Sequence, residues 1–507
     1  MNTWASGYVT DIEYTHGYYP ELNPARILLA FVVNGLTFPE VGTACELGFG
    51  QGVSTNIHAS SSRVSWWGTD FNPTQAGFAQ ELGVVSGAKV FDDSFAEFCT
   101  RPDLPDFDFI ALHGIWSWVS DENRLLIVDF VRRKLKVGGV LYISYNTFPG
   151  WSTAAPLQHL MIEHKDKTGA SGLGIVKQVD GALEFIDRLL NTNPLWARAN
   201  PSIAERFAKI APQNKKYLAH EYFNQEWSPM YFSDMARYLE TAKLSFACSA
   251  NYNDYIDDIN LKSEHQKLLN DIPDSHFRQT IRDYMVNQQF RKDYWVKGAR
   301  KLNFVQKADA MRSQAVVLTT HRADVQLKTA GLLGGVSMVE SIYNPILDFL
   351  GDYVPKTIGQ IEAGLKTHNL TQIQQAVLLL IGQGHLSPAQ DVKIVETCKT
   401  HAKTLNQVLL NKARGSGDVG YLANPVTGGG LPVNRFQQLF LLAYQQGQKS
   451  SEQMAQFAWN TLIAQGQRLI KEGKTLETAE DNLNELTAQA GSFNSKLLPI
   501  LRAHHML

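Results

Sequence analysis

The sequence has little of several things that would define whole classes of protein. Its 507 residues include only four cysteines, Cys45, Cys99, Cys248 and Cys398, which lie far apart without a C-x-x-C pair. This scarcity argues against a disulfide framework and against a structural zinc site. Lysine and arginine (47) nearly balance aspartate and glutamate (49), so no overall basic field is available to hold nucleic acid.

Long apolar runs are missing as well. The longest one near the start, residues 27–33, is much shorter than the roughly 20 residues that span a bilayer. No basic stretch followed by an apolar run marks a secretory signal. Hydrophobic residues make up 44% of the chain and charged residues 19%, as in well-buried globular proteins. We therefore expect a cytoplasmic protein with no membrane insertion and no metal.

The most informative stretch that is present is a glycine-rich turn after an apolar run. Glu46, Gly48, Gly50 and Gly52 alternate along it, and residues 53–58 have the pattern of a helix. Glycines lack a Cβ, so the backbone can turn sharply beside a ligand. The acid two residues before the first glycine makes the stretch resemble motif I of class I S-adenosylmethionine (SAM) methyltransferases. In that motif the acid lies near the methionine end of the cofactor.

The main alternative is a dinucleotide site. Its fingerprint is Gly-x-Gly-x-x-Gly, whose last glycine packs a helix against a strand. Here that position is Val53, and Gly52 comes one residue early. The carboxylate of Glu46 would also repel a pyrophosphate. An ordinary glycine-rich loop is a third interpretation, so the motif favours a methyltransferase without excluding the others.

Polar residues follow the next two expected strands. Asp70 comes after residues 65–69 and could accept hydrogen bonds from two ribose hydroxyls, as acids do in both SAM and NAD sites. Asp93 and Ser94 come after residues 88–91, in a loop that commonly contacts adenine in methyltransferases. The structural alternatives are a helix cap or turn for Asp70 and a solvated surface for the loop.

The order of the elements predicts the fold class. Residues 107–112 and 140–145 are expected to form two more strands, separated by a helix with one apolar face over 125–135. Strands that alternate with helices predict an α/β protein with a parallel, doubly wound sheet. Ligands of such sheets bind at the carboxyl ends of the strands. The glycine motif, both acids, His113 and Asn146 all fall at those ends, so we expect them to form one site.

Together these segments resemble bacterial class I methyltransferases that carry a methyltransferase regulatory domain. The best-known relatives are the rickettsial protein lysine methyltransferases that modify outer-membrane protein. The resemblance implies a Rossmann-like core, SAM as the cofactor, S-adenosylhomocysteine as the product, and a protein lysine as the first candidate acceptor. Methyl transfer to a glycan or small metabolite, or a non-catalytic SAM-binding scaffold, stays open. The segments that carry the resemblance are residues 18–24, 46–52, 113–119, 144–151, 217–224 and 421–428.

Four residues are candidates for the methyl transfer itself. His113 could orient the acceptor or relay its proton, and Trp116 could wall a channel around an aliphatic chain. Tyr145 and Asn146 could offer oxygen atoms to an amine. The structural alternatives are a satisfied histidine and aromatic core residues.

Tyrosines crowd the first twenty residues, and two of them are candidate cofactor contacts. Tyr14 and Tyr18 could form a lid in which aromatic rings cover the adenosyl group and attract the sulfonium. The alternative is packing of these rings on the core. The resemblance favours the lid.

The rest of the chain suggests two further domains after a SAM-binding core over residues 1–155. Residues 156–305 are expected to be a helical insertion with the regulatory region, and its runs 244–248 and 293–298 could supply strands 6 and 7 of the core sheet. Residues 306–507 are expected to be mainly helical.

The C-terminal domain contains a winged-helix-like segment. Residues 357–368, 371–381 and 384–386 resemble a helix-turn-helix followed by the start of a wing. The second helix has no Arg or Lys to contact phosphates, so we expect protein docking or a structural role, with no nucleic acid bound. The oligomeric state stays open between a monomer and a homodimer.

Overall fold

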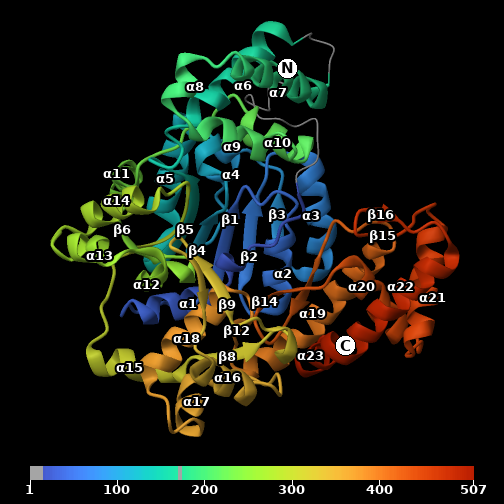
Figure 1. Cartoon of the computed structure of the whole chain (residues 1–507). Helices are drawn as coiled ribbons and strands as arrows, with labels where there is room; N and C mark the ends of the chain where they lie inside the picture. The colour runs from blue at the N-terminus through green and yellow to red at the C-terminus, as the bar shows by residue number, and fades with distance from the viewer. Residues whose placement is uncertain (1–14, 170–173) are drawn as a thin grey trace.

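A seven-stranded sheet lies at the centre of the protein (Figure 1). The computed structural model describes residues 15–169 and 174–507. The strand order is β3-β2-β1-β4-β5-β7-β6. β3, β2, β1, β4 and β5 are parallel, whereas β7 runs antiparallel to β5 and to β6. The strands are β1 (Thr43–Leu47), β2 (Ser65–Thr69), β3 (Lys89–Phe91), β4 (Phe107–Leu112), β5 (Leu135–Asn146), β6 (Leu244–Ser249) and β7 (Phe290–Lys297).

The last two strands come from far along the chain. β6 and β7 contain the two runs that were expected to complete the sheet, and β7 pairs with residues Val140 to Asn146 of β5. The elements between them are η4 (Tyr252–Tyr255), α12 (Asp257–Asn260), α13 (Ser263–Asn270) and α14 (Ser275–Val286). The central sheet therefore needs residues up to Lys297 to be complete.

Helices cover both faces of the sheet, and alternate residues of each strand pack into different hydrophobic cores. Tyr142 and Tyr294 point to the face covered by α1, α2 and α3. Leu141, Tyr145 and Trp295 point to the opposite face, covered by α4, α5 and α11. Neighbouring residues of a strand point to opposite faces. The helices are α1 (Pro24–Val33), α2 (Val53–Ser61), α3 (Pro73–Ser86), α4 (Phe95–Phe98), α5 (Asp121–Lys134) and α11 (Phe232–Glu240).

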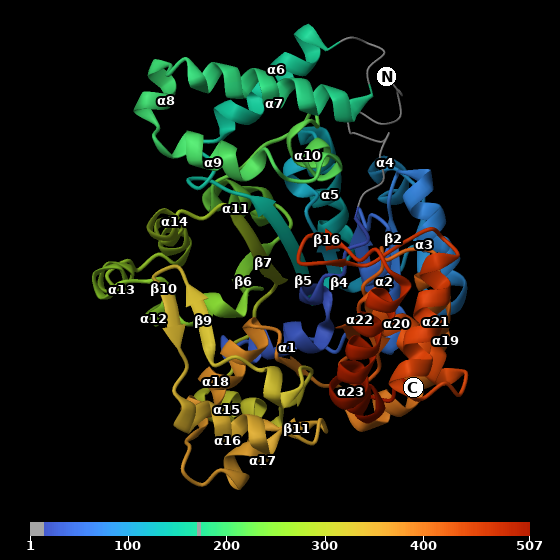
Figure 2. The same cartoon turned by 45° about the vertical axis from the view of Figure 1, so that its right-hand side comes forward.

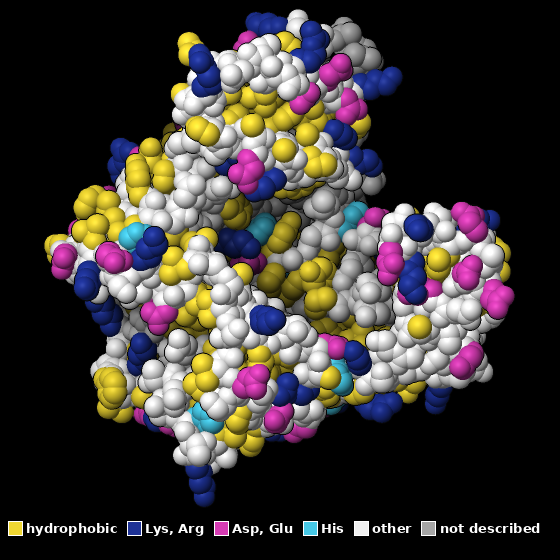
Figure 3. All heavy atoms as spheres, in the orientation of Figure 1, with side chains coloured by type: hydrophobic (Ala, Val, Ile, Leu, Met, Phe, Trp, Pro, Cys, Tyr) yellow, Lys and Arg dark blue, Asp and Glu magenta, His cyan; other side chains and the backbone are white. Residues whose placement is uncertain are grey.

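A lobe of helices stands beyond the carboxyl ends of the parallel strands, at the top of Figures 1 and 2. It has its own small core, which includes Trp151, Ile186, Phe207 and Leu218. A hollow separates this helical lobe from the C-terminal helices (Figure 3). The lobe comprises α6 (Ala155–Thr168), α7 (Ile175–Asn191), α8 (Leu195–Ala199), α9 (Ser202–Ile210) and α10 (Lys215–Tyr222).

A winged-helix-like unit follows the sheet at the other end of the molecule. Its three short strands pair in the order β11-β8-β12. The helix α18, which would read DNA in a helix-turn-helix protein, is buried throughout residues 376–381. The elements are α15 (Phe304–Ser313), β8 (Ala315–Leu318), β9 (Lys328–Gly331), β10 (Gly334–Ser337), α16 (Glu340–Phe349), β11 (Lys356–Thr357), α17 (Ile358–Gly364), α18 (Leu370–Gly382) and β12 (Leu386–Pro388).

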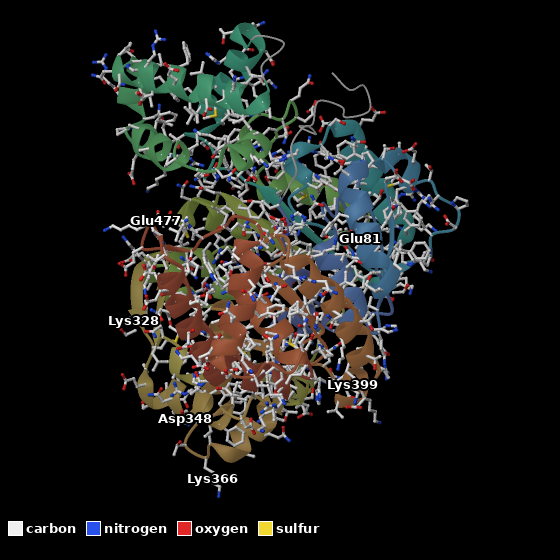
Figure 4. The ribbon with its side chains drawn as sticks, turned by 90° about the vertical axis from the view of Figure 1, so that its right-hand side faces the viewer. Glu81, Lys328, Asp348, Lys366, Lys399 and Glu477 are labelled. Atoms are coloured by element: carbon white, nitrogen blue, oxygen red, sulfur yellow. The ribbon has the colours of Figure 1, made fainter. Side chains whose placement is uncertain are left out.

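The last helices pack back on the sheet-covering helices. α19 lies against α2 and α3. Glu81 of α3, labelled in Figure 4, accepts the Lys412 ammonium of α19 at 2.8 Å. The elements are α19 (Val392–Ala413), β13 (Tyr421–Asn424), β14 (Gly429–Pro432), α20 (Arg435–Gln445), α21 (Ser451–Ile463), β15 (Ile470–Lys471), β16 (Lys474–Thr475), α22 (Ala479–Ser492) and α23 (Leu498–Ala503). None of the helices in the described ranges combines the length and the apolar composition that crossing a bilayer requires.

Candidate active site

A cavity of 530 Å³ opens at the carboxyl ends of β1 to β4. Gly48 and Gly50 line it after β1, Asp70 after β2, and His113 after β4. Its size is typical of small-molecule sites. The structure therefore brings residues from four separate βα units to one site, as the strand-end positions predicted.

The glycine motif has left-handed backbone at all three glycines, with φ of +72° at Gly48, +58° at Gly50 and +66° at Gly52. A Cβ on Gly48 would lie 2.5 Å from Cδ1 of Ile115, which also lines the cavity. Gly52 is outside the cavity lining and has a different reason to be glycine. Its Cβ would lie 2.5 Å from that of Ala79, so its absence lets α2 pack closely on α3.

Glu46 lies one residue before the end of β1, and its fully buried carboxyl group does not line the cavity. One oxygen accepts the Thr55 hydroxyl, and the other, Oε1, is buried without a hydrogen-bond partner. Burial raises the pKa of Glu46 to about 8, with the Thr55 hydrogen bond acting in the opposite direction. An unsatisfied buried oxygen is costly, so the site favours a ligand that supplies a donor or a positive charge.

Asp70 joins the second strand to the glycine turn. Its Oδ2 accepts the Gly50 backbone N–H at 2.8 Å, and its Oδ1 accepts the Asn72 N–H at 3.0 Å. Burial raises the pKa of Asp70 to about 7, although both backbone hydrogen bonds oppose the change. The carboxylate thus holds the loop in shape while it lines the cavity.

The loop after β3 lies at the cavity as well. Asp93 pairs with Arg101 at 2.9 Å and keeps its side chain about one-fifth exposed. Ser94 caps α4 through a reciprocal pair of hydrogen bonds with Glu97. Both residues line the cavity, so this loop combines a structural role with a place at the candidate site.

His113 contacts two tyrosine side chains. The Tyr19 ring stacks on it with centroids 3.5 Å apart, and the Tyr142 hydroxyl lies 2.8 Å from His113 Nδ1. Burial lowers the pKa of His113 to about 3, so the imidazole is neutral at physiological pH. Tyr19 lines the cavity beside it. Neither tyrosine was a site candidate from the sequence, although Tyr19 belongs to the crowded N-terminal tyrosines.

The structure does not bring Trp116, Tyr145 or Asn146 to the cavity lining. Trp116 is fully buried, and its indole N–H donates to Met230 Sδ. Tyr145 is buried on the sheet face away from Tyr142, where its hydroxyl donates to Asp293. Because alternate residues of a strand point to opposite faces, the Tyr145 phenol lies away from the site. Asn146 is almost fully buried, and its backbone N–H donates to Ser117.

Tyr18 also differs from the expected lid. The Tyr18 ring packs between His58 and Tyr421 and lines a different cavity, where burial raises its pKa far above the ordinary value. Its neighbour Tyr19 covers His113 instead. Tyr14 lies outside the described residues.

The charged side chains that line the cavity are acidic. Asp70, Asp93, Glu122 and Glu226 line it, and none of its described lining residues is a lysine or arginine. Within the described ranges, His, Cys, Asp and Glu side chains form no group that could hold a metal ion. A cation therefore suits this site better than an anion.

Comparison with known proteins identifies the family. The family model of a predicted methyltransferase regulatory domain matches residues 214–297. The uncharacterized protein sll1526 of Synechocystis sp. is 39% identical over 98% of this chain and 99% of its own length. PKMT2 from Rickettsia typhi, solved in complex with AdoHcy, has the same fold, with a TM-score of 0.70, 16% identity, and coverage of 97% of this chain and 99% of its own. The chain belongs to the same family as sll1526, contains a stretch that matches the methyltransferase regulatory domain, and has the fold of a protein solved with AdoHcy.

Proposed function

We propose that this chain transfers a methyl group from SAM to the side-chain amine of a protein lysine. The observation that carries this proposal is the acid-lined cavity at the strand ends, whose described lining includes no lysine or arginine. A sulfonium and a lysine ammonium are both cations, which such a cavity attracts. The pyrophosphate of a dinucleotide would meet only repulsion there.

The residues at the cavity fit SAM. Gly48 offers bare backbone to the cavity, Asp70 suits ribose hydroxyls, and Asp93 with Ser94 suits adenine. The unpartnered Oε1 of Glu46 suits the ammonium of the methionine end. When bound, SAM supplies a methyl group on a positively charged sulfur.

Lysine as the methyl acceptor is supported by His113, by Tyr19 and by the resemblance to the rickettsial lysine methyltransferases. A lysine ammonium has a pKa near 10.4 and no free lone pair, so the site must lower that pKa. Aromatic walls do so by desolvation. The neutral His113 imidazole adds no positive charge that would repel the amine.

A cytoplasmic location is part of the proposal, because Cys45, Cys99, Cys248 and Cys398 are all free thiols. The choice between monomer and homodimer stays a prediction that sedimentation would test.

The experiment uses SAM labelled with tritium in its methyl group. We expect the purified protein to bind SAM in calorimetry and to transfer label to lysate protein, which acid hydrolysis releases as methyl-lysine. Gly48→Arg should abolish SAM binding. Gly87→Arg is the matched control, because Gly87 also has a positive φ, of +79°, but open space around its Cβ position. Label in glycan or small-molecule fractions alone would refute the lysine acceptor, and binding without any transfer would favour a scaffold.

A further inference from the structure

A second cavity, of 490 Å³, shares a wall with the candidate active site. The wall is the N-terminal segment that leads into the short helix Pro20–Leu22. Gly17 and Tyr19 line the active-site cavity. Tyr18, Pro20 and Glu21 line the second cavity. Side chains of one segment thus point alternately into the two cavities, so the cavities lie on opposite sides of it.

The second cavity lies at the same edge of the sheet as the active site. Phe290 and Lys292 of β7 line it, and they pair with Asn146 and Ser144 at the end of β5. Because β7 runs antiparallel to β5, its first residues lie at the carboxyl ends of the parallel strands. The second cavity therefore lies beyond β5, next to the strand ends that carry the SAM-site candidates.

Contacts within the wall connect Glu21 with His113. The Tyr294 hydroxyl donates to the Glu21 backbone carbonyl at 2.6 Å. The Tyr294 ring lies 5.7 Å from the ring of Tyr142, whose hydroxyl is 2.8 Å from His113 Nδ1. Tyr19, two residues before Glu21, stacks on the same imidazole. These contacts place the Glu21 end of the second cavity close to His113.

Two charged residues that line the second cavity have buried atoms with no hydrogen-bond partner among the described residues. These atoms are Glu21 Oε2 and Arg26 Nε. Glu21 is only 7% exposed, and its other oxygen accepts the Lys292 ammonium at 2.6 Å. Burial would raise the pKa of Glu21, but the charges of Lys292 and Arg26 outweigh this effect and lower it. A buried acceptor and a buried donor at one cavity favour a ligand that offers both a donor and an acceptor.

The second cavity continues along the molecule. A third cavity, of 600 Å³, lies between the winged-helix-like unit and the C-terminal helices, and Thr319, Gly384 and Pro432 line both. Leu386 and Ser387, which also line the second cavity, belong to β12, an outer strand of its sheet. Outer strands carry backbone groups that can pair with another chain. An elongated space beside such a strand suits an extended polypeptide.

We propose that the second cavity binds an extended segment of the protein acceptor beside the target lysine, with a backbone N–H donating to Glu21 Oε2 and a backbone carbonyl accepting from Arg26 Nε. This rests on the proposed lysine methylation. Each peptide unit carries one such donor and one such acceptor. A hydrogen bond to the Glu21 carboxylate is charge-assisted and therefore stronger than one between neutral groups. The acceptor is held by its backbone outside the SAM cavity, and its lysine side chain reaches the methyl group beside Tyr19.

The test fills the second cavity with Ser387→Trp. The probe is a fluorescein-labelled peptide with one lysine between uncharged glycine-serine flanks, added to protein saturated with S-adenosylhomocysteine. Fluorescence anisotropy should show binding to the parent and at least tenfold weaker binding to the variant. In methyl transfer from labelled SAM, the KM for the peptide should rise at least tenfold while kcat stays within threefold. SAM affinity should stay within twofold by calorimetry, which also shows that the variant is folded.

Two further variants sharpen the test. Glu21→Gln keeps the size of the side chain but removes its charge, and should weaken peptide binding at least fivefold. Ser337→Trp is the matched control, because it adds the same ring to an exposed strand residue of the winged-helix-like unit that lines none of the three cavities, and it should change no measurement.

The outcomes separate this inference from the proposed function. If the parent does not bind the peptide, or if Ser387→Trp and Glu21→Gln bind it as tightly as the parent does, the inference is wrong. Methyl-lysine formed on lysate protein would in that case leave the proposed function intact. If the parent binds SAM but forms methyl-lysine neither on the peptide nor on lysate protein, the proposed acceptor itself is wrong.

Discussion

Glu46→Gln separates the effect of the buried carboxylate on stability from its effect on binding. Burial raises the pKa of Glu46 from 4.5 to about 8. The folded protein therefore keeps a proton that the unfolded chain releases in this pH window. Stability falls as the pH rises through the window, by about 1.4 kcal/mol per pH unit, and thus by roughly 3 kcal/mol between pH 5 and 7.5.

Glutamine has nearly the shape of the protonated acid and can still accept the Thr55 hydroxyl, but it does not ionise. The variant and the parent should therefore be about equally stable at pH 5. At pH 7.5 the variant should be the more stable one, with the difference in free energy of unfolding grown by roughly 3 kcal/mol. Asp70 is present in both proteins, so its own titration largely cancels in this comparison.

The assay is urea unfolding of both proteins, followed by circular dichroism at pH 5 and pH 7.5. Glu240→Gln removes an exposed carboxylate and serves as the control, with no pH-dependent difference expected. The Glu46 variant should at the same time bind SAM at least tenfold more weakly, because glutamine cannot lose a proton to become the carboxylate that pairs with the methionine ammonium. A stability difference that stays constant with pH, or unchanged SAM affinity, would refute the reasoning.

Three other changes test the packing, the histidine and the ion pair. Gly52→Ala brings a methyl group to 2.5 Å from Ala79 and should lower stability by about 1–3 kcal/mol in urea unfolding, whereas unchanged stability would contradict this packing. His113→Ala should leave SAM affinity in calorimetry unchanged and slow methyl transfer. Because His113 stays neutral down to about pH 3, the parent rate should show no histidine inflection near pH 6.5. Lys292→Met leaves the buried Glu21 unpaired and should cost about 3 kcal/mol of stability at pH 7, measured by urea unfolding, and less at pH 4, where Glu21 takes up a proton.

The sheet was largely predictable because its signals are local. The runs 244–248 and 293–298 identified β6 and β7 as strands, and the alternation of strands with helices predicted the parallel part. The placement of Gly48, Asp70 and Asp93 at one site followed from topology, since the carboxyl ends of parallel strands share one edge. The division into domains at residues 155 and 305 stays a prediction.

The acceptor side was harder to predict because single residues alternate between faces. Tyr145 and Tyr142 are both tyrosines of β5, but only Tyr142 points to the face where His113 lies. Tyr18 and Tyr19 are neighbours with the same side chain, and only Tyr19 covers His113. The start of β5 and the path of the N-terminal segment decide these choices, and neither leaves a signal in the sequence.

By itself the sequence determined which residues end the parallel strands, and with them the acids and glycines of the candidate SAM site. That information is local, because hydrophobic periodicity and glycine spacing act within a few residues. Only the tertiary structure decided which side chains from distant segments meet there. Glu21, Glu46 and Glu221 all raise the pKa of Tyr19, although 200 residues separate the first from the last, because folding brings the short helix Pro20–Leu22, β1 and α10 together.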